Sequence, residues 1–452
     1  MKILITDPIP EEGRRILSNA FQVEYVPGLS EEELRRKIAH ADALVVRSET
    51  KVTARVLEGA ESLKIIGRAG VGTDNIDVDF ATRKGILVVN SPEGNTISAS
   101  EHTMGLLLAL ARNIPQAHVS LHGKSWKRSQ FVGVELYNKV LGVVGLGKIG
   151  REVVRRARSF QMQIIGHDPY LTPEQVEELG IEMSGLDDLC AKADFITLHV
   201  PLTRETEKII GPRQFTLMRP EARIVNCARG GIIDEDALHE ALLGKKIAGA
   251  ALDVFSQEPP FSSPLLDLEE VVVTPHLGAS TEEAQLKVAV AVAEQIVDFL
   301  SGKPARSPVN LPAFRPEVLG EAAPYLGLAE RMGSLLAQLA EGPIQSVGLT
   351  LFGELAEISA PGEVVLSTVI LKGLLSHELG DGVNYVNAAH LARTRGIQVV
   401  EGRSHKAAES SNLFLVRVKT PTGEWTCGGS LPRGSRKGRI VQLNDFRVDL
   451  VP

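Results

Sequence analysis

Short runs of apolar residues alternate with segments of helical periodicity over about the first 300 residues. Each run has four or five residues, which is typical of a buried strand, and the segments between the runs have helix-like content. The predicted strands of the first part are residues 2–6, 43–47, 64–67 and 87–90, and the predicted helices are residues 11–18, 31–39, 54–59 and 77–84. Strands that alternate with helices predict a parallel sheet with helices on both faces.

A second series of the same kind follows. A helix is predicted at residues 98–112, because Ser98 lies three residues before Glu101, the spacing of a capping box, and an apolar stretch comes next. The predicted strands of this series are residues 140–144, 163–167, 195–199, 223–227, 249–254 and 271–274. A helix from residue 281 to about residue 300 is predicted to close it.

Residues 301–312 contain three prolines and no periodicity, so they are predicted to form a linker. Beyond the linker the pattern predicts a separate mixed α/β domain. Its predicted strands are residues 347–351, 364–369, 397–400, 413–420 and 439–448, and its predicted helices are residues 324–339 and 387–395.

The composition narrows the class of protein. The chain has 452 residues, 43% hydrophobic and 23% charged, which excludes wholesale disorder. Its net charge of −7 makes nucleic acid an unfavourable partner, since phosphate contacts need clustered Lys and Arg. There are three cysteines without a CxxC pair, no hydrophobic signal segment, and no apolar run of the ~18 residues that a membrane-spanning helix needs. We therefore expect a cytoplasmic multidomain protein without metal or membrane contacts.

The glycine-rich segment after the predicted strand 140–144 is the strongest local motif. Gly145, Gly147 and Gly150 form GxGxxG between a strand and a helical stretch, the context of a dinucleotide site. Asp168 follows 18 residues later, at the end of the next strand, where a carboxylate binds a ribose 2′-hydroxyl. It would repel a 2′-phosphate, so the motif favours NAD. The alternative is a glycine-rich turn beside a surface aspartate.

Three charged or titratable residues lie just past later predicted strands, where open α/β sheets bind ligands. Arg229, Glu258 and His276 are the set that oxidation of a 2-hydroxy acid requires. A histidine can take the hydroxyl proton, a carboxylate can orient the ring, and an arginine can bind the substrate carboxylate and polarise the carbonyl. Singly, each residue has a structural alternative: a strand-end histidine, a turn residue before two prolines, or a surface ion pair.

With these motifs the chain resembles the D-isomer-specific 2-hydroxyacid dehydrogenase family, and within it the branch that acts on 3-phosphoglycerate. The discriminating segments are residues 45–53 (VVRSETKVT), 67–75 (GRAGVGTDN), 90–95 (NSPEGN) and 225–231 (VNCARGG). The resemblance implies NAD-dependent oxidation of 3-phospho-D-glycerate to 3-phosphohydroxypyruvate, the first step of phosphorylated serine biosynthesis.

The resemblance also implies the roles of individual residues. Arg229, Glu258 and His276 are expected to be catalytic. Arg47 and Ser48 are expected to bind the substrate phosphate, and Arg68 or Asn95 the carboxylate end. The residues expected to bind NAD are Val71, Gly145, Gly147, Lys148, Ile149, Gly150, Asp168, Val200, Pro201, Cys227, Ala228, Arg229, Asp253, His276, Gly278 and Ala279.

The implied architecture is a Rossmann-type doubly wound nucleotide-binding domain, residues 99–280, inserted in a flavodoxin-like substrate domain, residues 1–98 and 281–305. Residues 306–452 resemble the family's mixed α/β intervening domain through residues 327–330, 383–389 and 444–450. A serine-binding ACT domain is expected to be absent. A homodimer or homotetramer is expected, with residues 123–128, including Trp126, at a dimer interface.

Three alternatives remain open from the sequence. Another D-2-hydroxyacid dehydrogenase, such as a glyoxylate or hydroxypyruvate reductase or a 2-oxoglutarate reductase, would share the catalytic residues without needing Arg47. A non-catalytic nucleotide-sensing protein would not need Arg229, Glu258 and His276. Finally, the basic segment 430–439 could bind a regulatory anion through Arg433, Arg436 and Arg439, or could be only a solvated loop.

Overall fold

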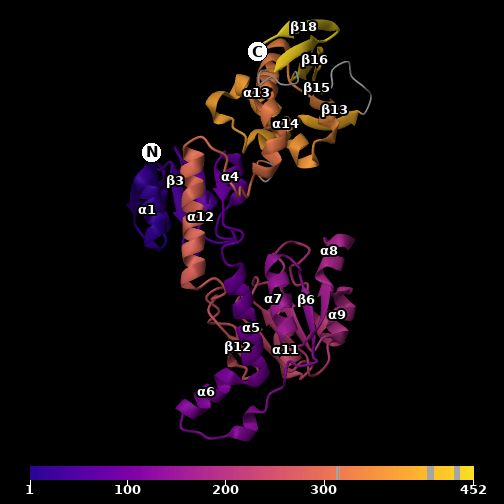
Figure 1. Cartoon of the computed structure of the whole chain (residues 1–452). Coiled ribbons are helices and arrows are strands. Elements are labelled where there is room, and N and C mark those ends of the chain that lie inside the picture. Colours follow the sequence, from indigo (N-terminus) through magenta and orange to yellow (C-terminus); the bar gives the residue numbers. More distant parts are fainter. Residues whose placement is uncertain (312–313, 315, 405–411, 432–437) are drawn as a thin grey trace. The chain divides into compact units, whose positions relative to one another are not determined.

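The computed structural model describes residues 1–452 except 312–313, 315, 405–411 and 432–437. The chain divides into two compact units (Figure 1). One contains Met1–Pro92 together with Val288–Pro452, and the other contains Glu93–Lys287. The first and last parts of the chain therefore share a unit, and the predicted three-domain boundaries stay a prediction. No helix among the described residues is both long and apolar enough to cross a membrane.

The N-terminal part of the first unit is a five-stranded parallel sheet in the order β2-β1-β3-β4-β5. Its two faces bury different side chains, because successive residues of a strand point in opposite directions. Ile3 and Ile5 pack toward α12, whereas Leu4 packs toward α2 and α3. The elements are β1 (Lys2–Ile5), α1 (Glu11–Ala20), β2 (Gln22–Tyr25), α2 (Glu31–Ile38), β3 (Ala43–Val46), α3 (Ala54–Glu58), β4 (Ile65–Arg68), α4 (Val78–Arg83), β5 (Leu87–Val89) and α12 (Glu282–Leu300).

The second unit is built on a seven-stranded parallel sheet in the order β12-β11-β10-β9-β6-β7-β8. Helices α5 and α7 cover one face, and α9, α10 and α11 cover the other. Its strands are β6 (Val140–Val144), β7 (Gln163–His167), β8 (Glu182–Met183), β9 (Phe195–Leu198), β10 (Arg223–Asn226), β11 (Gly249–Leu252) and β12 (Val271–Val273). Its helices are α5 (Thr96–Arg112), α6 (Ile114–His122), α7 (Lys148–Ser159), α8 (Pro173–Leu179), α9 (Leu186–Lys192), α10 (Pro212–Leu217) and α11 (Glu235–Leu243).

These two strand orders confirm the predicted fold class. The order 2-1-3-4-5 of the first sheet is flavodoxin-like. In the second sheet the chain turns back between β6 and β9, which makes the doubly wound Rossmann arrangement. Such a reversal opens a crevice at the carboxyl ends of the strands, where ligands bind.

The C-terminal part of the first unit is a mixed six-stranded sheet in the order β14-β13-β15-β16-β17-β18. Only β13 and β14 are parallel to each other. The long helices α13 and α14 pack on this sheet and on each other, which confirms a mixed α/β domain. The elements are α13 (Pro316–Leu339), β13 (Ser346–Gly353), α14 (Ala360–Leu379), α15 (Ala388–Thr394), β14 (Gln398–Ser404), β15 (Asn412–Thr420), β16 (Gly423–Ser430), β17 (Arg439–Leu443) and β18 (Phe446–Leu450).

Three local predictions are wrong. The predicted strand 364–369 lies inside α14, most of whose residues are buried, so its apolar run carries no helical periodicity. The predicted strand 439–448 is two strands, because Asn444 turns the chain with a φ of 49°. Helix α5 begins at Thr96, so Ser98 is no N-cap; its hydroxyl donates to the carbonyl oxygen of Gly278 at 2.9 Å instead.

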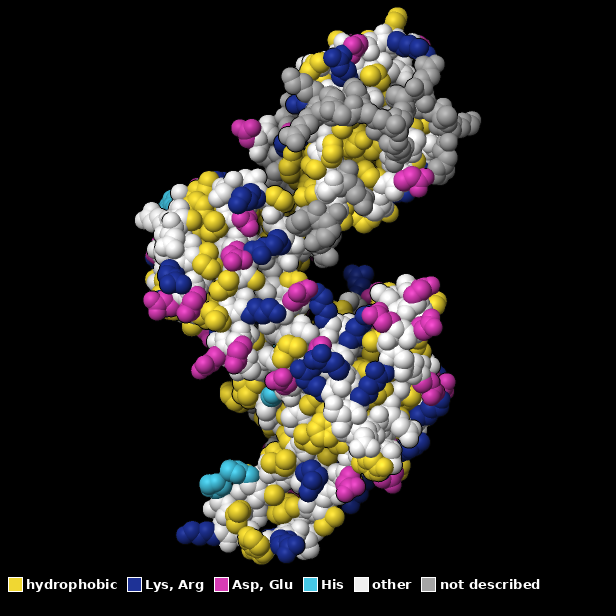
Figure 2. Space-filling model, in the orientation of Figure 1, with side chains coloured by type: hydrophobic (Ala, Val, Ile, Leu, Met, Phe, Trp, Pro, Cys, Tyr) yellow, Lys and Arg dark blue, Asp and Glu magenta, His cyan; other side chains and the backbone are white. Residues whose placement is uncertain are grey.

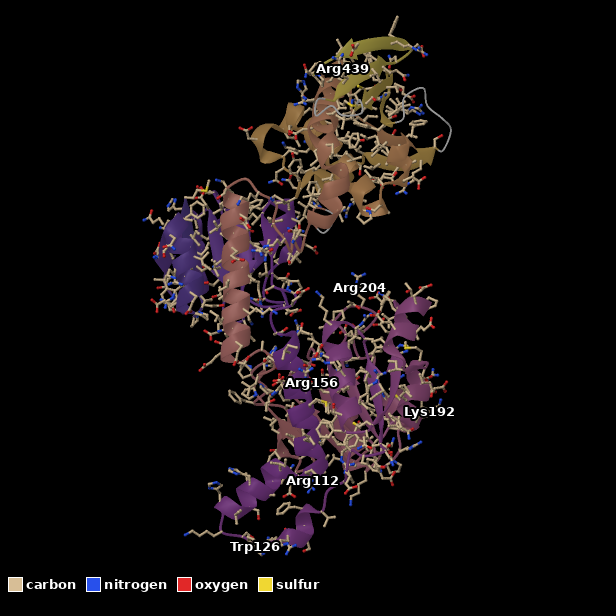
Figure 3. The ribbon with its side chains drawn as sticks, in the orientation of Figure 1. Arg112, Trp126, Arg156, Lys192, Arg204 and Arg439 are labelled. Atoms are coloured by element: carbon tan, nitrogen blue, oxygen red, sulfur yellow. The ribbon has the colours of Figure 1, made fainter. Side chains whose placement is uncertain are left out.

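An exposed arm, defined as residues 113–137, extends from the second unit. Several of its large apolar side chains lie on the surface, as the space-filling view shows (Figure 2), whereas Leu136 is buried. Trp126, near the tip of the arm (Figure 3), is 77% exposed. The other exposed apolar residues of the arm are Ile114, Val119, Leu121, Val132 and Tyr137. Six exposed large apolar side chains on one segment are more than a solvated arm needs, so the arm is suited to contact with another protein chain.

Candidate active site

The glycine-rich loop connects β6 to α7 in the way that a dinucleotide site requires. Gly145 has a φ of +91°, and a Cβ there would lie 2.6 Å from the carbonyl oxygen of His199. A Cβ on Gly150 would lie 2.1 Å from the carbonyl oxygen of Gly145. A Cβ on Gly147, in contrast, would have no atom within 4 Å. Packing therefore requires glycine at positions 145 and 150. At Gly147 the surface of the loop is free of neighbouring atoms and is accessible to a ligand.

The N-terminus of α7 and the side chain of Asp168 complete this loop. Gly147 is the N-cap of α7, so no side chain caps the helix's first N–H groups, which can bind an anion. Asp168 accepts hydrogen bonds from the backbone N–H groups of Leu146, at 2.9 Å, and Tyr170, at 3.0 Å. The carboxylate is thereby held beside the glycine loop. This cradle fits the pyrophosphate and ribose of a dinucleotide.

Most of the other residues predicted to bind NAD lie at the same edge of the sheet. Lys148 and Ile149 begin α7, Val200 and Pro201 follow β9, Cys227 and Ala228 follow β10, and Gly278 and Ala279 follow β12. The fold brings these segments together because the carboxyl ends of parallel strands lie at one edge. Val71 belongs to the other unit, where it follows β4.

Glu258 and His276 form a hydrogen-bonded pair. Nδ1 of His276 lies 2.9 Å from Oε2 of Glu258. Burial raises the pKa of Glu258, but the hydrogen bond and the charge of His276 outweigh it and hold that pKa below its ordinary value. Glu258 is therefore a carboxylate at neutral pH and can only accept, so Nδ1 carries the proton. This leaves Nε2 of His276 as the basic nitrogen.

Arg229 lies in the loop that follows β10. Asn226, at the end of that strand, accepts from the N–H of Ala228 at 3.0 Å and donates to the carbonyl oxygen of Arg229 at 2.9 Å. The guanidinium of Arg229 donates to the carbonyl oxygen of Ala228 at 2.6 Å. A buried asparagine thus fixes the backbone of the loop that carries the predicted catalytic arginine.

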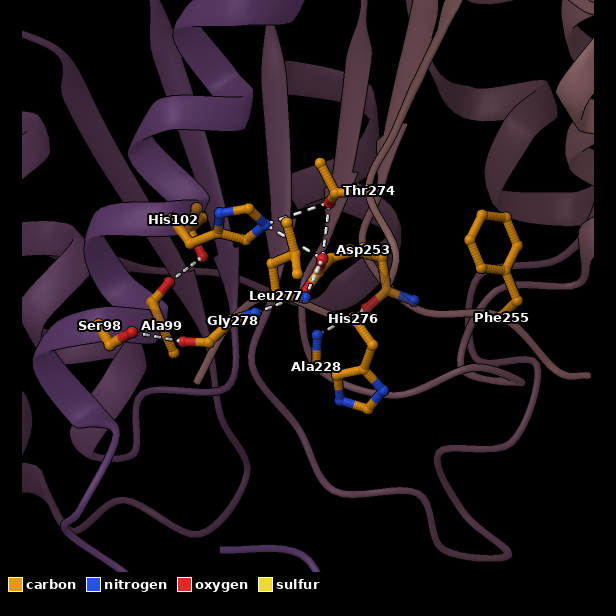
Figure 4. A network of polar contacts seen from close by, with 12 residues as sticks. Ser98, Ala99, His102, Ala228, Asp253, Phe255, Thr274, His276, Leu277 and Gly278 are labelled. Atoms are coloured by element: carbon orange, nitrogen blue, oxygen red, sulfur yellow. Dashed lines mark hydrogen bonds and ion pairs between the residues drawn. The ribbon is translucent and has the colours of Figure 1, made fainter. Parts of the chain in front are cut away.

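Asp253 organises the loop that carries His276 (Figure 4). Its fully buried carboxylate accepts from the hydroxyl of Thr274 at 2.6 Å and from the N–H groups of Leu277, at 2.7 Å, and Gly278, at 2.8 Å. Nε2 of His102, on α5, lies 3.1 Å from it. Burial raises the pKa of Asp253, but these contacts lower it below its ordinary value. The contacts from Leu277 and Gly278 fix the backbone that follows His276.

Two other titratable groups at this edge are excluded from acid–base chemistry by burial. Burial lowers the pKa of His199 to about 4, so this ring is neutral at physiological pH. Burial raises the pKa of the Cys227 thiol to about 12, so it stays protonated and unreactive. Of His102, His167, His199 and His276, only His276 combines a carboxylate partner with an exposed ring, 44% of whose surface is accessible.

The loop that carries Glu258 is held from α11. Oε1 of Glu235 accepts from the N–H of Ser256 at 2.6 Å and from its hydroxyl at 2.7 Å, two residues before Glu258. The N–H of Phe255 donates to Oε1 of Glu258 at 3.2 Å. Glu235 thus holds the loop that carries Glu258, and sequence reasoning missed it because an acidic residue in a first helical turn already has a local explanation.

Removal of the Glu235 side chain should misplace Glu258 without unfolding the protein. We expect Glu235→Ala to lower kcat about tenfold, because small displacements of catalytic groups are costly. Glu235→Gln should recover most of the activity, since its amide oxygen can accept the same two hydrogen bonds. Asp236→Ala, which removes the neighbouring carboxylate, is the matched control. Equal kcat in all three variants would contradict the positioning role; Tm should stay unchanged throughout.

Arg47 and Ser48 lie in a loop after β3 that is fixed by a buried aspartate. Asp7 accepts hydrogen bonds from the N–H of Arg47 and from the N–H and hydroxyl of Thr50. Nδ2 of Asn75 donates to the carbonyl oxygens of Arg47 and Thr50, both at 2.7 Å. The hydrogen bonds from Asp7 and Asn75 therefore fix the backbone of this loop. The side chain of Ser48 is exposed.

Arg68 and Asn95 also lie in ordered surroundings, each within its own unit. The guanidinium of Arg68 lies over Gly70, where a Cβ would be only 1.5 Å from Nη1, so a glycine is required there. Asn95 is the N-cap of α5, and its Oδ1 is buried without a hydrogen-bond partner among the described residues. An orphaned amide oxygen of this kind is typical of a ligand site.

The predicted anion segment falls largely outside the described residues, since Arg433 and Arg436 are not described. Arg439 is described, and its guanidinium pairs with Asp449 on the neighbouring strand. No group of three or more His, Cys, Asp or Glu side chains in the described part of the chain could hold a metal ion.

Comparison with known proteins identifies relatives along the whole chain. "D-isomer specific 2-hydroxyacid dehydrogenase, NAD binding domain" matches residues 104–278, and "D-3-phosphoglycerate dehydrogenase intervening domain" matches residues 321–444. A D-3-phosphoglycerate dehydrogenase of Methanocaldococcus jannaschii is 49% identical over 100% of this chain and 85% of its own length.

Solved structures resemble about two-thirds of the chain. A protein of Thermus thermophilus is 32% identical, with a TM-score of 0.64 over 68% of this chain and all of its own. A D-lactate dehydrogenase of Aquifex aeolicus, determined with NAD and lactic acid, is 26% identical, with a TM-score of 0.59 over 67% of this chain and 96% of its own.

Proposed function

The chain belongs to the D-3-phosphoglycerate dehydrogenases, a branch of the D-isomer-specific 2-hydroxyacid dehydrogenase family, and we propose that Arg229, Glu258 and His276 are its catalytic residues. It is an NAD-dependent oxidoreductase that converts 3-phospho-D-glycerate to 3-phosphohydroxypyruvate, a reaction of phosphorylated serine biosynthesis. The observation that supports the assignment of the catalytic residues is the 2.9 Å contact between His276 and Glu258 at the carboxyl edge of the nucleotide-binding sheet.

His276 acts as the base. Because its Nδ1 donates to Glu258, its Nε2 takes the proton from the hydroxyl on the substrate's second carbon. Glu258 stabilises the positive charge that the ring then acquires, and it keeps the ring in the tautomer that leaves Nε2 basic. In the reverse direction the protonated ring returns the proton to the carbonyl oxygen.

Arg229 binds the carboxylate of the substrate and polarises its reacting oxygen, because a guanidinium can donate two parallel hydrogen bonds. Arg47 and Ser48 bind the phosphate, and Arg68 or Asn95 bind the carboxylate end. The side chains of Asp7 and Asn75 fix the backbone of the loop that carries Arg47. This supports the role of Arg47, since a phosphate site needs donors with a fixed position.

The glycine loop and Asp168 would hold the cofactor. The open surface at Gly147 and the uncapped N-terminus of α7 would receive the pyrophosphate, and Asp168 would accept hydrogen bonds from a ribose. NAD, when bound, supplies the nicotinamide that accepts the hydride. Asp253 is fully buried, so its contribution to cofactor binding would be to position the segment that contains Gly278 and Ala279.

We further propose that the chain works as a homodimer or homotetramer in the cytoplasm. The exposed apolar side chains of the arm, among them Val119, Trp126 and Val132, support association through this segment. Measurement of the molecular mass in solution tests the proposal: a monomer at micromolar concentration would contradict it.

A substrate panel tests the preference for a phosphorylated acid. NAD reduction is followed with 3-phospho-D-glycerate, D-glycerate, D-lactate and D-2-hydroxyglutarate. We expect kcat/KM to be highest for the phosphorylated acid. Equal or better turnover of the other acids would instead favour a broader D-2-hydroxyacid dehydrogenase, such as a hydroxypyruvate or 2-oxoglutarate reductase.

The variant Arg47→Gln tests whether Arg47 is responsible for the preference for the phosphorylated acid. It should raise the KM for 3-phospho-D-glycerate about tenfold or more, because a charge-assisted phosphate contact is lost, while the rate with D-glycerate stays the same. Lys51→Gln removes the same charge from a neighbouring exposed position and is the control. If both substrates respond equally to Arg47→Gln, the residue does not select the phosphate.

A further inference from the structure

A cleft of about 430 Å³ lies in the first unit, where α4 of the first sheet meets α14 and α15 of the C-terminal part. Its volume is in the range of small-molecule sites. The seam beside it is tightly built: Nδ2 of Asn384 donates to the carbonyl oxygen of Gly85 at 2.8 Å, and a Cβ on Gly85 would lie 2.5 Å from that nitrogen. None of the residues lining this cleft belongs to the glycine loop or to the proposed substrate site.

The charged side chains that line the cleft are predominantly basic. Arg83 comes from α4, and His390 and Arg393 lie three residues apart on α15, so they share one face of that helix. Among the described residues, no carboxylate lies within ion-pair distance of the guanidinium of Arg83 or Arg393. Asp79, on the same face of α4 as Arg83, is the one carboxylate in the lining.

The hydroxyl groups of the lining cannot replace these cations as donors. Thr82 donates to the carbonyl oxygen of Val78 at 2.7 Å, and Thr368 donates to that of Val364, also at 2.7 Å. Tyr385, the third hydroxyl in the lining, donates to Oε2 of Glu330 at 2.8 Å, so all three hydroxyl groups can only accept a further hydrogen bond. The amide nitrogen of Asn310 also has its partners within the protein, since it donates to the hydroxyl oxygen of Thr82 and to the carbonyl oxygen of Ile86. The available donors are the two guanidinium groups and the imidazole, and such a set is suited to a group with several anionic oxygens.

We propose that this cleft binds a small organic phosphate, with its phosphate group between Arg83 and Arg393. The remainder of the molecule would lie on the apolar lining formed by Leu311, Val364 and Val386, and its hydroxyl groups could donate to Thr368. Helix α4 lies beside the first sheet and α15 lies in the C-terminal part of the unit. A ligand that contacts both helices would therefore hold these two parts together, beside the contact between Asn384 and Gly85.

The test is hydrogen–deuterium exchange of the full chain titrated with inorganic phosphate, with chloride at equal ionic strength as the salt control. Phosphate should slow exchange in α4 (Val78–Arg83) and α15 (Ala388–Thr394). In the double variant Arg83→Gln/Arg393→Gln, the phosphate concentration that gives half of this slowing should rise about tenfold or more. The matched double variant Lys84→Gln/Arg395→Gln removes two positive charges beside the cleft and should behave like the original chain.

A variant that gains affinity keeps the proposal testable even if the double variant folds poorly. Asp79→Asn removes the carboxylate that repels phosphate. The phosphate concentration that gives half of the slowing should therefore fall about threefold. The proposal is overturned if phosphate leaves exchange in α4 and α15 unchanged. It is also overturned if the two double variants respond alike, or if Asp79→Asn needs as much phosphate as the original chain.

Discussion

His276→Gln is expected to lower kcat about 10³-fold while the affinity for NADH stays within about twofold. Glutamine has no titratable nitrogen, so the substrate hydroxyl loses the group that takes its proton. The side chain of His276 lies outside the glycine loop, whose packing depends on Gly145 and Gly150, so the cofactor site should persist. Steady-state kinetics and NADH fluorescence titration measure the two quantities separately.

The matched variant Glu258→Gln measures the contribution of the carboxylate that accompanies His276 separately from the contribution of His276 as the base. It keeps the size of the side chain and an oxygen that can accept from Nδ1, but removes the negative charge that stabilises the protonated ring. We expect kcat to fall about 10- to 100-fold, less than for His276→Gln. If His276→Gln retained most of its turnover, another group would have to be the base, and the 2.9 Å pair would be structural.

The residues that sequence reasoning found share a property: each occupies a position fixed by the strand pattern. Arg229 and His276 immediately follow predicted strands, and the glycine loop lies between a strand and a helix, so the fold class alone brings them to one edge of the sheet. The same alternation predicted parallel sheets with helices on both faces, whereas the doubly wound and flavodoxin-like arrangements were implied only by the family resemblance. No side-chain contact had to be known.

The residues that sequence reasoning missed act through contacts between distant segments. His102 contacts Asp253 across 151 positions of the sequence, and Asp7 holds Arg47 across 40. No local pattern marks such pairs, because a lone histidine on a helix or an aspartate after a strand has many other uses. Helix α14 was missed for the opposite reason: most of its residues are buried, which removes the periodicity that would have distinguished it from a strand.

The glycine loop allows a prediction that distinguishes folding from cofactor binding. Gly150→Ala places a Cβ 2.1 Å from the carbonyl oxygen of Gly145, a backbone atom that can move only with the strand end. We expect the free energy of unfolding to fall by about 3 kcal/mol, as for other overpacked sites, and NADH binding to be lost with the loop geometry. Chemical denaturation and NADH titration measure these effects.

Gly147→Ala should leave the fold intact and still weaken the cofactor complex. Its Cβ would have no atom within 4 Å, and Gly147 has an ordinary φ of −67°, so the free energy of unfolding should stay within about 0.5 kcal/mol. In a dinucleotide site the second glycine allows the backbone to approach the pyrophosphate, so a methyl group there should raise the Kd for NADH about tenfold or more. An unchanged Kd would mean that the pyrophosphate does not lie against this loop, and the assignment of the cofactor residues would then be wrong even though the fold is right.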